Sequence, residues 1–84
     1  MEVSFSQSAE RDLGRLTKSV AMRVFDKIKW LVENFESADL LSLGGQLSGF
    51  YKLRVGDWRV IYKVDWMKDV ITIVAIDHRS KVYK

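Results

Sequence analysis

The side chains of this chain whose types and spacing could do chemistry are a set of cations and one phenol near the end. The set consists of Lys52, Arg54, Arg59 and Lys63 in one segment, and His78, Arg79, Lys81 and Tyr83 in the last residues. Cations bind phosphate and stabilise the charge that develops during phosphoryl transfer. A phenol with a pKa near ~10 is a poor base at pH 7, but nearby cations lower that pKa, and closing a gap of ~3 units takes ~4 kcal/mol. These groups could therefore deprotonate an RNA 2′-hydroxyl beside a bound phosphate, with no metal.

Each of these groups also has a purely structural interpretation. Lys and Arg are ordinary residents of a solvated sheet face, and the ring of Tyr83 could pack on a sheet edge. His78 could orient its neighbours or contact RNA, or it could be structural. Composition and spacing alone leave these alternatives open.

Several other chemistries are excluded by what the sequence lacks. His78 is the only histidine and cysteine is absent, so a zinc site would need a carboxylate cluster that the chain does not have. The glycines at 44 and 45 lack the spacing of a phosphate-binding or dinucleotide-binding loop, and no serine has a nucleophile-elbow setting. We expect no cofactor and no metal.

A predicted β-hairpin positions the first group of cations. Two runs of β-type residues, 50–55 and 58–62, flank Gly56-Asp57, which suits a tight turn. The predicted register pairs Val55 with Trp58, Leu53 with Val60, Tyr51 with Tyr62, Arg54 with Arg59 and Lys52 with Ile61. Cross-strand partners share a face, so one face is apolar and the other carries the cations. Because like charges placed opposite each other cost stability, an anion bound there would explain the pattern.

The segments before this hairpin predict one strand and two helices. Residues 2–6 alternate polar and apolar, which predicts a short edge strand, and Ser6 or Ser8 could cap the helix that follows. Ala9, Leu13 and Leu16 form one apolar stripe. A second stripe consists of Val20, Val24, Ile28, Leu31 and Phe35. The stripe is interrupted around residues 17–19, so we expect a helical hairpin with a break there.

The remaining segments complete the predicted sheet. Residues 36–49 are predicted to form one short helical turn and then a loop packed on the domain. A second turn at 65–69 leads into residues 70–76, which are apolar on both faces and typical of an interior strand. Residues 77–84 are predicted to be a polar tail. The fold class is therefore α+β in the order β-α-α-β-β-β, a helical hairpin packed on one face of a small, mainly antiparallel sheet, and residues 1–84 are predicted to be one domain.

Composition and charge bound the kind of partner. The 84 residues are 48% hydrophobic and carry a net charge of +3. The charge is uneven, since residues 1–47 hold six Lys/Arg against seven Asp/Glu and residues 48–84 hold eight against four. A positive field on the hairpin half suits a polyanion such as RNA or DNA. No apolar run approaches the ~18 residues of a membrane span and no signal-peptide pattern is visible, so we expect a cytoplasmic protein with no membrane partner.

Two stretches of the chain carry a family resemblance: Tyr51-Lys52-Leu53-Arg54-Val55-Gly56-Asp57-Trp58-Arg59-Val60-Ile61-Tyr62 and, further on, His78-Arg79-Ser80-Lys81-Val82-Tyr83. Together they resemble the RelE branch of the RelE/ParE toxin superfamily. Residues 5–13 and Leu43-Gly44-Gly45 also fit, so the resemblance covers essentially the whole chain. It implies a toxin of a type II toxin–antitoxin system that enters the ribosomal A site of the 30S subunit, beside rRNA, and cleaves mRNA there. The 2′-oxygen attacks the adjacent phosphate and leaves a 2′,3′-cyclic phosphate and a 5′-hydroxyl.

The resemblance also implies roles for individual residues. Lys52 and Arg54 match phosphate-binding positions, and Arg59 matches the arginine that stabilises the transition state. Tyr83 matches the terminal tyrosine, and Arg79 matches a basic residue of the terminal motif. Lys52, Arg59, Arg79 and Tyr83 are thus the expected catalytic residues, and Arg54, Lys63, His78 and Lys81 are the expected RNA-binding residues.

The implied partners are a cognate acidic, RelB-like antitoxin, the ribosome and mRNA, with operator DNA bound only through the antitoxin complex. The chain departs from the pattern at Asp77, where some members carry an extra arginine, and no long C-terminal helix is expected. Two alternatives stay open: a ParE-like inhibitor of DNA gyrase on the same fold, and a non-catalytic module that only binds its antitoxin. The basic and aromatic residues from 78 to 83 argue against the gyrase inhibitor, whose branch generally lacks them.

Overall fold

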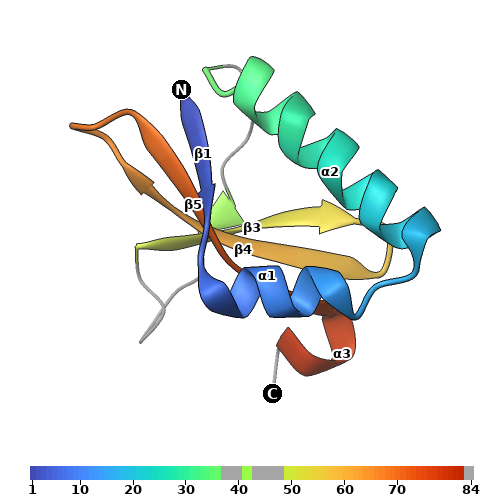
Figure 1. Ribbon diagram of the computed structural model, residues 1–84. Helices are drawn as coiled ribbons and strands as arrows, with labels where there is room; N and C mark the ends of the chain where they lie inside the picture. Colours follow the sequence, from blue (N-terminus) through green and yellow to red (C-terminus); the bar gives the residue numbers. More distant parts are fainter. Residues whose placement is uncertain (37–40, 43–48, 83–84) are drawn as a thin grey trace.

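Five strands form one mixed sheet in the computed structural model, which describes residues 1–36, 41–42 and 49–82 (Figure 1). The elements follow the chain as β1 (Glu2–Phe5), α1 (Gln7–Gly14), α2 (Lys18–Glu33), β2 (Leu41–Ser42), β3 (Phe50–Val55), β4 (Trp58–Asp65), β5 (Val70–His78) and α3 (Arg79–Val82). The strand order in the sheet is β1-β5-β4-β3-β2, with only β1 and β5 parallel. The predicted α+β class with a mainly antiparallel sheet is confirmed.

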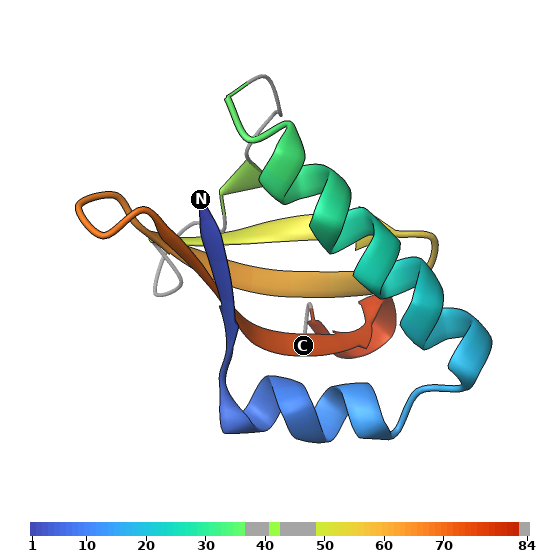
Figure 2. The ribbon, with the colours of Figure 1, turned by 45° about the horizontal axis from the view of Figure 1, so that its top comes forward.

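Polar caps define the beginnings of the two long helices. The Ser6 hydroxyl accepts a hydrogen bond from the Ala9 amide at 3.1 Å, and the Thr17 hydroxyl accepts one from the Val20 amide at 3.3 Å. Each cap satisfies an amide that a helix end would leave without a partner. The helices lie on the same face of the sheet and diverge from the connection between them (Figure 2). The predicted break between two helices is present, but it lies at residues 15–17, slightly earlier than the predicted 17–19.

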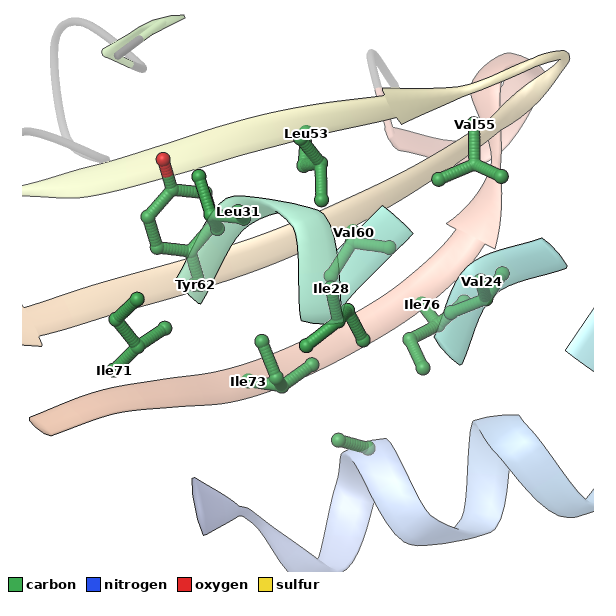
Figure 3. Packing of buried hydrophobic residues seen from close by; sticks show 11 residues of the cluster. Val24, Ile28, Leu31, Leu53, Val55, Val60, Tyr62, Ile71, Ile73 and Ile76 are labelled. Carbon is green, nitrogen blue, oxygen red and sulfur yellow. The ribbon is translucent and has the colours of Figure 1, made fainter. Parts of the chain in front are cut away.

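The core lies between these helices and the sheet. Val24, Ile28 and Leu31 of α2 point toward side chains of β3, β4 and β5 (Figure 3). The buried hydrophobic residues of the sheet are Leu53, Val55, Val60, Tyr62, Ile71, Ile73 and Ile76, and Ala9 of α1 joins them. The face predicted to be apolar is therefore the face that the helices cover.

The interior strand β5 contains a bulge that α1 supports. Ile61 pairs with Ala75, but Tyr62 pairs with Ile73, so the register shifts between these two pairs. The Ile76 amide next to the bulge donates to the Asp12 carboxylate at 2.9 Å, and the Ser6 hydroxyl donates to the Val74 carbonyl at 3.2 Å. The side chains of Asp12 and of the helix cap Ser6 thus satisfy backbone groups of β5 at the bulge residue and two residues beyond it.

Two sequence-based expectations for the loops were wrong. The tail does not begin at residue 77, because Asp77 and His78 complete β5 opposite Arg59 and Trp58, and α3 follows at once. Residues 36–49 were expected to contain no strand, but β2 pairs with Tyr51 and Lys52 of β3. The helical turn expected at the start of this connector falls largely on residues 37–40, outside the described part of the chain.

Among the described residues, no helix has the length and apolar character needed to cross a membrane.

Candidate nucleic-acid interface

A tight turn sets the register of the hairpin that carries most of the candidate residues. Gly56 has a φ of 61°, in the left-handed region that favours glycine. A side chain there would also meet the Arg23 guanidinium, whose Nη2 lies 2.6 Å from the position a Cβ would take. The predicted pairs of β3 and β4 are all present, from Val55 with Trp58 to Tyr51 with Tyr62.

The face of the sheet away from α1 and α2 is basic. Alternation along the strands places four side chains there, opposite the buried set. We call the positions of Lys52, Arg54, Arg59 and Lys63 on this side the basic face. Arg54 and Lys63 are exposed and Lys52 is half-buried. On β5, Lys63 faces Thr72 and Arg59 faces Asp77, so one acid adjoins the cations.

Arg59 has the predicted position, but its guanidinium is turned onto the hairpin turn. It is the one buried charged residue of the described chain, with 8% exposure. Its Nη1 donates to the carbonyls of Gly56 at 2.8 Å and Trp58 at 2.9 Å. Its Nε is buried and has no hydrogen-bond partner among the described residues. Arg59 therefore holds the turn in this conformation and keeps one buried donor unused.

The end of the chain folds back onto the same turn. The Arg79 amide donates to the Asp57 carbonyl at 2.8 Å, and the Arg79 Nε lies 3.7 Å from the Asp57 carboxylate. The His78 ring packs edge-on against Trp58, with ring centroids 5.6 Å apart. In Figures 1 and 2, α3 lies on the side of the sheet away from α2, and it contacts β4 and β5. The terminal turn thus adjoins the end of the basic face at Arg59.

His78 and Lys81 are held by local contacts. The Ser80 amide donates to His78 Nδ1 at 3.3 Å, and the Ser80 hydroxyl lies 3.0 Å from the same nitrogen. A neutral His78 that accepts this bond carries its proton on Nε2. The Lys81 ammonium lies 3.9 Å from the Asp77 carboxylate, in an exposed pair. Tyr83 lies outside the described residues, so its place in the site stays a prediction.

One buried tyrosine has a perturbed pKa, on the other face of the sheet. Burial, together with the neighbouring Tyr51 phenol, raises the pKa of Tyr62 to about 12. The two rings stack with centroids 5.6 Å apart. Tyr62 is a neutral core residue and not a candidate base. Within the described part of the chain, no group of three or more His, Asp or Glu side chains could hold a metal ion.

Residues 3–83 match the family model of the ParE toxin of the type II toxin–antitoxin system parDE. The chain belongs to this toxin family. The predicted membership of the RelE/ParE superfamily is confirmed.

Individual relatives agree with this assignment. Toxin RelG of Mycobacterium tuberculosis is 28% identical over 90 residues, which cover 98% of this chain and 94% of that protein. A chain in the crystal structure of the RelBE2 toxin–antitoxin complex of M. tuberculosis superposes with a TM-score of 0.83, 26% identity and coverage of 93% and 96%. A chain of the archaeal RelE–RelB complex of Pyrococcus horikoshii gives a TM-score of 0.69, 28% identity and coverage of 95% and 96%.

Two residues that contact the candidate site residues were not singled out from the sequence. Asp57 binds Arg79 through both its backbone and its side chain, and Ser80 fixes His78. The sequence signal for Asp57 was its place in the Gly56-Asp57 turn, which was assigned to the turn alone. Ser80 has the spacing of a residue that hydrogen-bonds two positions back, a local pattern that is common for serine.

Proposed function

We propose that this toxin is a ribosome-dependent endoribonuclease that cleaves mRNA in the ribosomal A site. The observation that carries the proposal is the attachment of the terminal turn to the end of the basic face through Asp57 and Arg79. Tyr83 follows α3 directly in the sequence, and the proposal assigns its phenol to the cations that would hold a phosphate.

In this mechanism Lys52 and Arg54 hold the phosphate on the 3′ side of the nucleotide whose 2′-hydroxyl attacks. Tyr83 takes the proton of the 2′-hydroxyl, the O2′–P bond forms, and the bond from phosphorus to the 5′-oxygen breaks. The leaving 5′-oxygen takes up a proton, and the products are a 2′,3′-cyclic phosphate and a 5′-hydroxyl. Cations around the phenol favour its ionised form, which makes it a stronger acceptor near neutral pH.

Arg59 has to exchange partners to take part. Its Nη1 binds two carbonyls of the turn in the free toxin, while its Nε has no partner among the described residues. A phosphate oxygen bound at the guanidinium replaces a neutral carbonyl by a charged acceptor, which makes a stronger hydrogen bond. We infer that substrate binding on the ribosome draws Arg59 from the turn toward the reacting phosphate.

We also propose a cognate, acidic RelB-like antitoxin as the protein partner. Support comes from the solved relatives, because those from M. tuberculosis and P. horikoshii are toxin–antitoxin complexes. Operator DNA would be bound only through the complex with the antitoxin. The remaining partners in this proposal are the 30S A site and its mRNA, and the compartment is the cytoplasm.

Expression of single variants in a bacterium tests the nuclease. The parent chain arrests growth, and primer extension on cellular mRNA shows discrete, in-frame breaks. Lys52→Ala and Tyr83→Phe relieve the arrest and abolish the breaks. Lys29→Ala is the matched control, because Lys29 is an exposed helix residue that pairs with Glu33 at 4.0 Å. Arg59→Ala also relieves the arrest, and its unfolding by urea is measured alongside because the same change removes two hydrogen bonds from the turn.

The proposed nuclease activity is contradicted if Lys52→Ala and Tyr83→Phe both stay fully toxic at parental protein levels. A second candidate is a ParE-like gyrase inhibitor, favoured by the name of the matching family model. It acts by binding, so it predicts DNA damage with intact transcripts. A chain that never slows growth but still binds its antitoxin is a non-catalytic module.

A further inference from the structure

A second group of cations lines a shallow cavity between α2 and the end of β3 at the hairpin turn. The cavity has a volume of about 430 Å³, and its lining includes Arg23, Asp26, Lys27, Trp30, Arg54 and Gly56. Only Arg54 of this set belongs to the basic face. Arg23, Lys27 and Trp30 come from the flank of α2 next to the core residues Val24, Ile28 and Leu31.

Within the part of the chain that the structure describes, the charges in this cavity are not balanced. The three cations face one carboxylate, Asp26, and no ion pair among the described residues involves any of the four. Arg23 lies against the turn at Gly56, with Nη2 at 2.6 Å from the position of an added Cβ. A site with a surplus of cations at hydrogen-bonding reach of an incoming group favours an anionic ligand.

The cavity also presents an aromatic ring. Trp30 is 42% exposed although it is one of the largest apolar side chains in the chain. The Lys27 ammonium lies 4.1 Å from the centroid of the Trp30 ring, a cation–π contact that keeps the lysine beside the ring. Cations placed around an exposed aromatic ring form the combination that binds single-stranded nucleic acid, with the phosphates on the cations and a base on the ring.

Arg54 connects this cavity with the basic face. It faces Arg59 across the hairpin and also lines the cavity. In the described part of the chain, β2 covers β3 only at Tyr51 and Lys52, so the edge of β3 at Arg54 is not covered by β2. An RNA strand bound along Lys63, Lys52 and Arg54 can therefore turn around this edge of the sheet and reach α2.

We propose that this cavity is a second RNA subsite, in which Arg23 and Arg54 bind a phosphate and a base stacks on Trp30. The proposal rests on the proposed function of the basic face as an RNA site, and it adds the nucleotides that flank the cleaved bond. RNA is favoured over an acidic protein segment because the cavity joins the phosphate-binding face directly and supplies a ring for stacking.

Binding of labelled single-stranded RNA by the purified toxin tests this subsite. The probes are a 2′-O-methyl nonanucleotide, which cannot be cleaved by 2′-oxygen attack, and a 2′-O-methyl trinucleotide that is too short to bridge both sites. Trp30→Ala weakens nonanucleotide binding by roughly 5- to 150-fold, the effect of one stacked base. Arg23→Gln lowers the salt dependence of log K by about 0.7, the effect of one phosphate. The affinity of these variants for the trinucleotide differs from that of the parent by no more than about twofold, because the basic face still binds this probe.

Lys29→Ala is the matched control, since it removes a cation from the same helix but outside the cavity. Arg23→Gln also guards against a Trp30 variant that folds poorly, because Arg23 is exposed. The proposal is wrong if Trp30→Ala and Arg23→Gln bind the nonanucleotide with the same affinity as Lys29→Ala. The proposal is also wrong if poly-glutamate binds as tightly as the nonanucleotide and the cavity variants lose that binding. The cavity would then bind an acidic protein segment. If the toxin cleaves no mRNA but the cavity variants still lose RNA affinity as predicted, the nuclease proposal is wrong and the subsite proposal stands.

Discussion

At the scale of one side chain, Arg59 shows what residue type and spacing can predict. The strand alternation correctly predicted its place opposite Arg54. The pairing of Arg59 with Asp77, next to the terminal turn, is a result of the structure. The hydrogen bonds of Arg59 to the carbonyls of Gly56 and Trp58 could not be predicted, because they depend on where the turn directs those carbonyls. The sequence therefore identified the residue and its face, but not the conformation in which the free toxin holds it.

Tyr62 was predicted to lie on the apolar face, and its burial has a consequence for stability at high pH. An unfolded tyrosine ionises near ~10, whereas folded Tyr62 keeps its proton up to about 12. Between these pH values the unfolded state binds fewer protons, so the free energy of unfolding falls as pH rises. The fall attributable to Tyr62 is about 2–3 kcal/mol across this window, fully developed once pH exceeds 12.

Urea unfolding of the parent and of Tyr62→Phe at several pH values between 9 and 12 measures this effect. The variant keeps the aromatic ring but has no group to ionise, so the parent loses stability relative to it as pH rises. Parallel curves for the two proteins would show that ionisation of Tyr62 is not linked to unfolding.

At the scale of elements, length decided what could be predicted. The hairpin of β3 and β4, the two capped helices and the interior strand β5 each carry enough residues for a period to be visible. A strand of two residues and a helix of four, such as β2 and α3, carry only about one repeat, which is too little for a period to be visible. Pairing with β3 creates the first, and the contacts of Asp57 with Arg79 stabilise the second, so both depend on tertiary contacts.

The bulge in β5 is an element-scale feature that depends on α1. The Asp12 carboxylate accepts from the Ile76 amide, which belongs to a buried residue with 2% exposure. Asp12→Ala leaves this amide without its acceptor and lowers the free energy of unfolding by about 1–3 kcal/mol. Asp12→Asn keeps an acceptor oxygen and restores most of the loss. Urea unfolding measures both, and Arg11→Ala on the same helix, exposed at the surface, stays within about 0.5 kcal/mol of the parent.

Equal stabilities of Asp12→Ala and Arg11→Ala would show that the bulge holds without the carboxylate. The exposed contact of Asp12 with Arg15 at 3.8 Å does not explain a loss of the expected size, because such pairs contribute little.

At the scale of the whole molecule, the chain separates its charges between the two sides of the sheet. Residues 1–47, which form both long helices, hold a slight excess of acids, and residues 48–84 hold the surplus of bases. The helices cover one face of the sheet (Figure 2). The basic face of Lys52, Arg54, Arg59 and Lys63, all from the second half of the chain, lies on the other side. The charge count alone predicted a polyanionic partner, but only the register determines which cations share a surface.

This surface predicts how RNA binding responds to salt. A triple variant, Lys52→Gln with Arg54→Gln and Lys63→Gln, removes three phosphate contacts while the helical face is unchanged. Each contact with a single strand contributes about 0.7 to the slope of log K against log salt, so the slope of the variant is shallower by about 2. The affinity of a single-stranded RNA, measured at several salt concentrations, gives the slope directly. Lys29→Ala leaves it as in the parent, because that cation lies on α2 and pairs with Glu33. A triple variant with the parental slope would mean that RNA is held elsewhere on the molecule and that the cations of this sheet face serve another ligand.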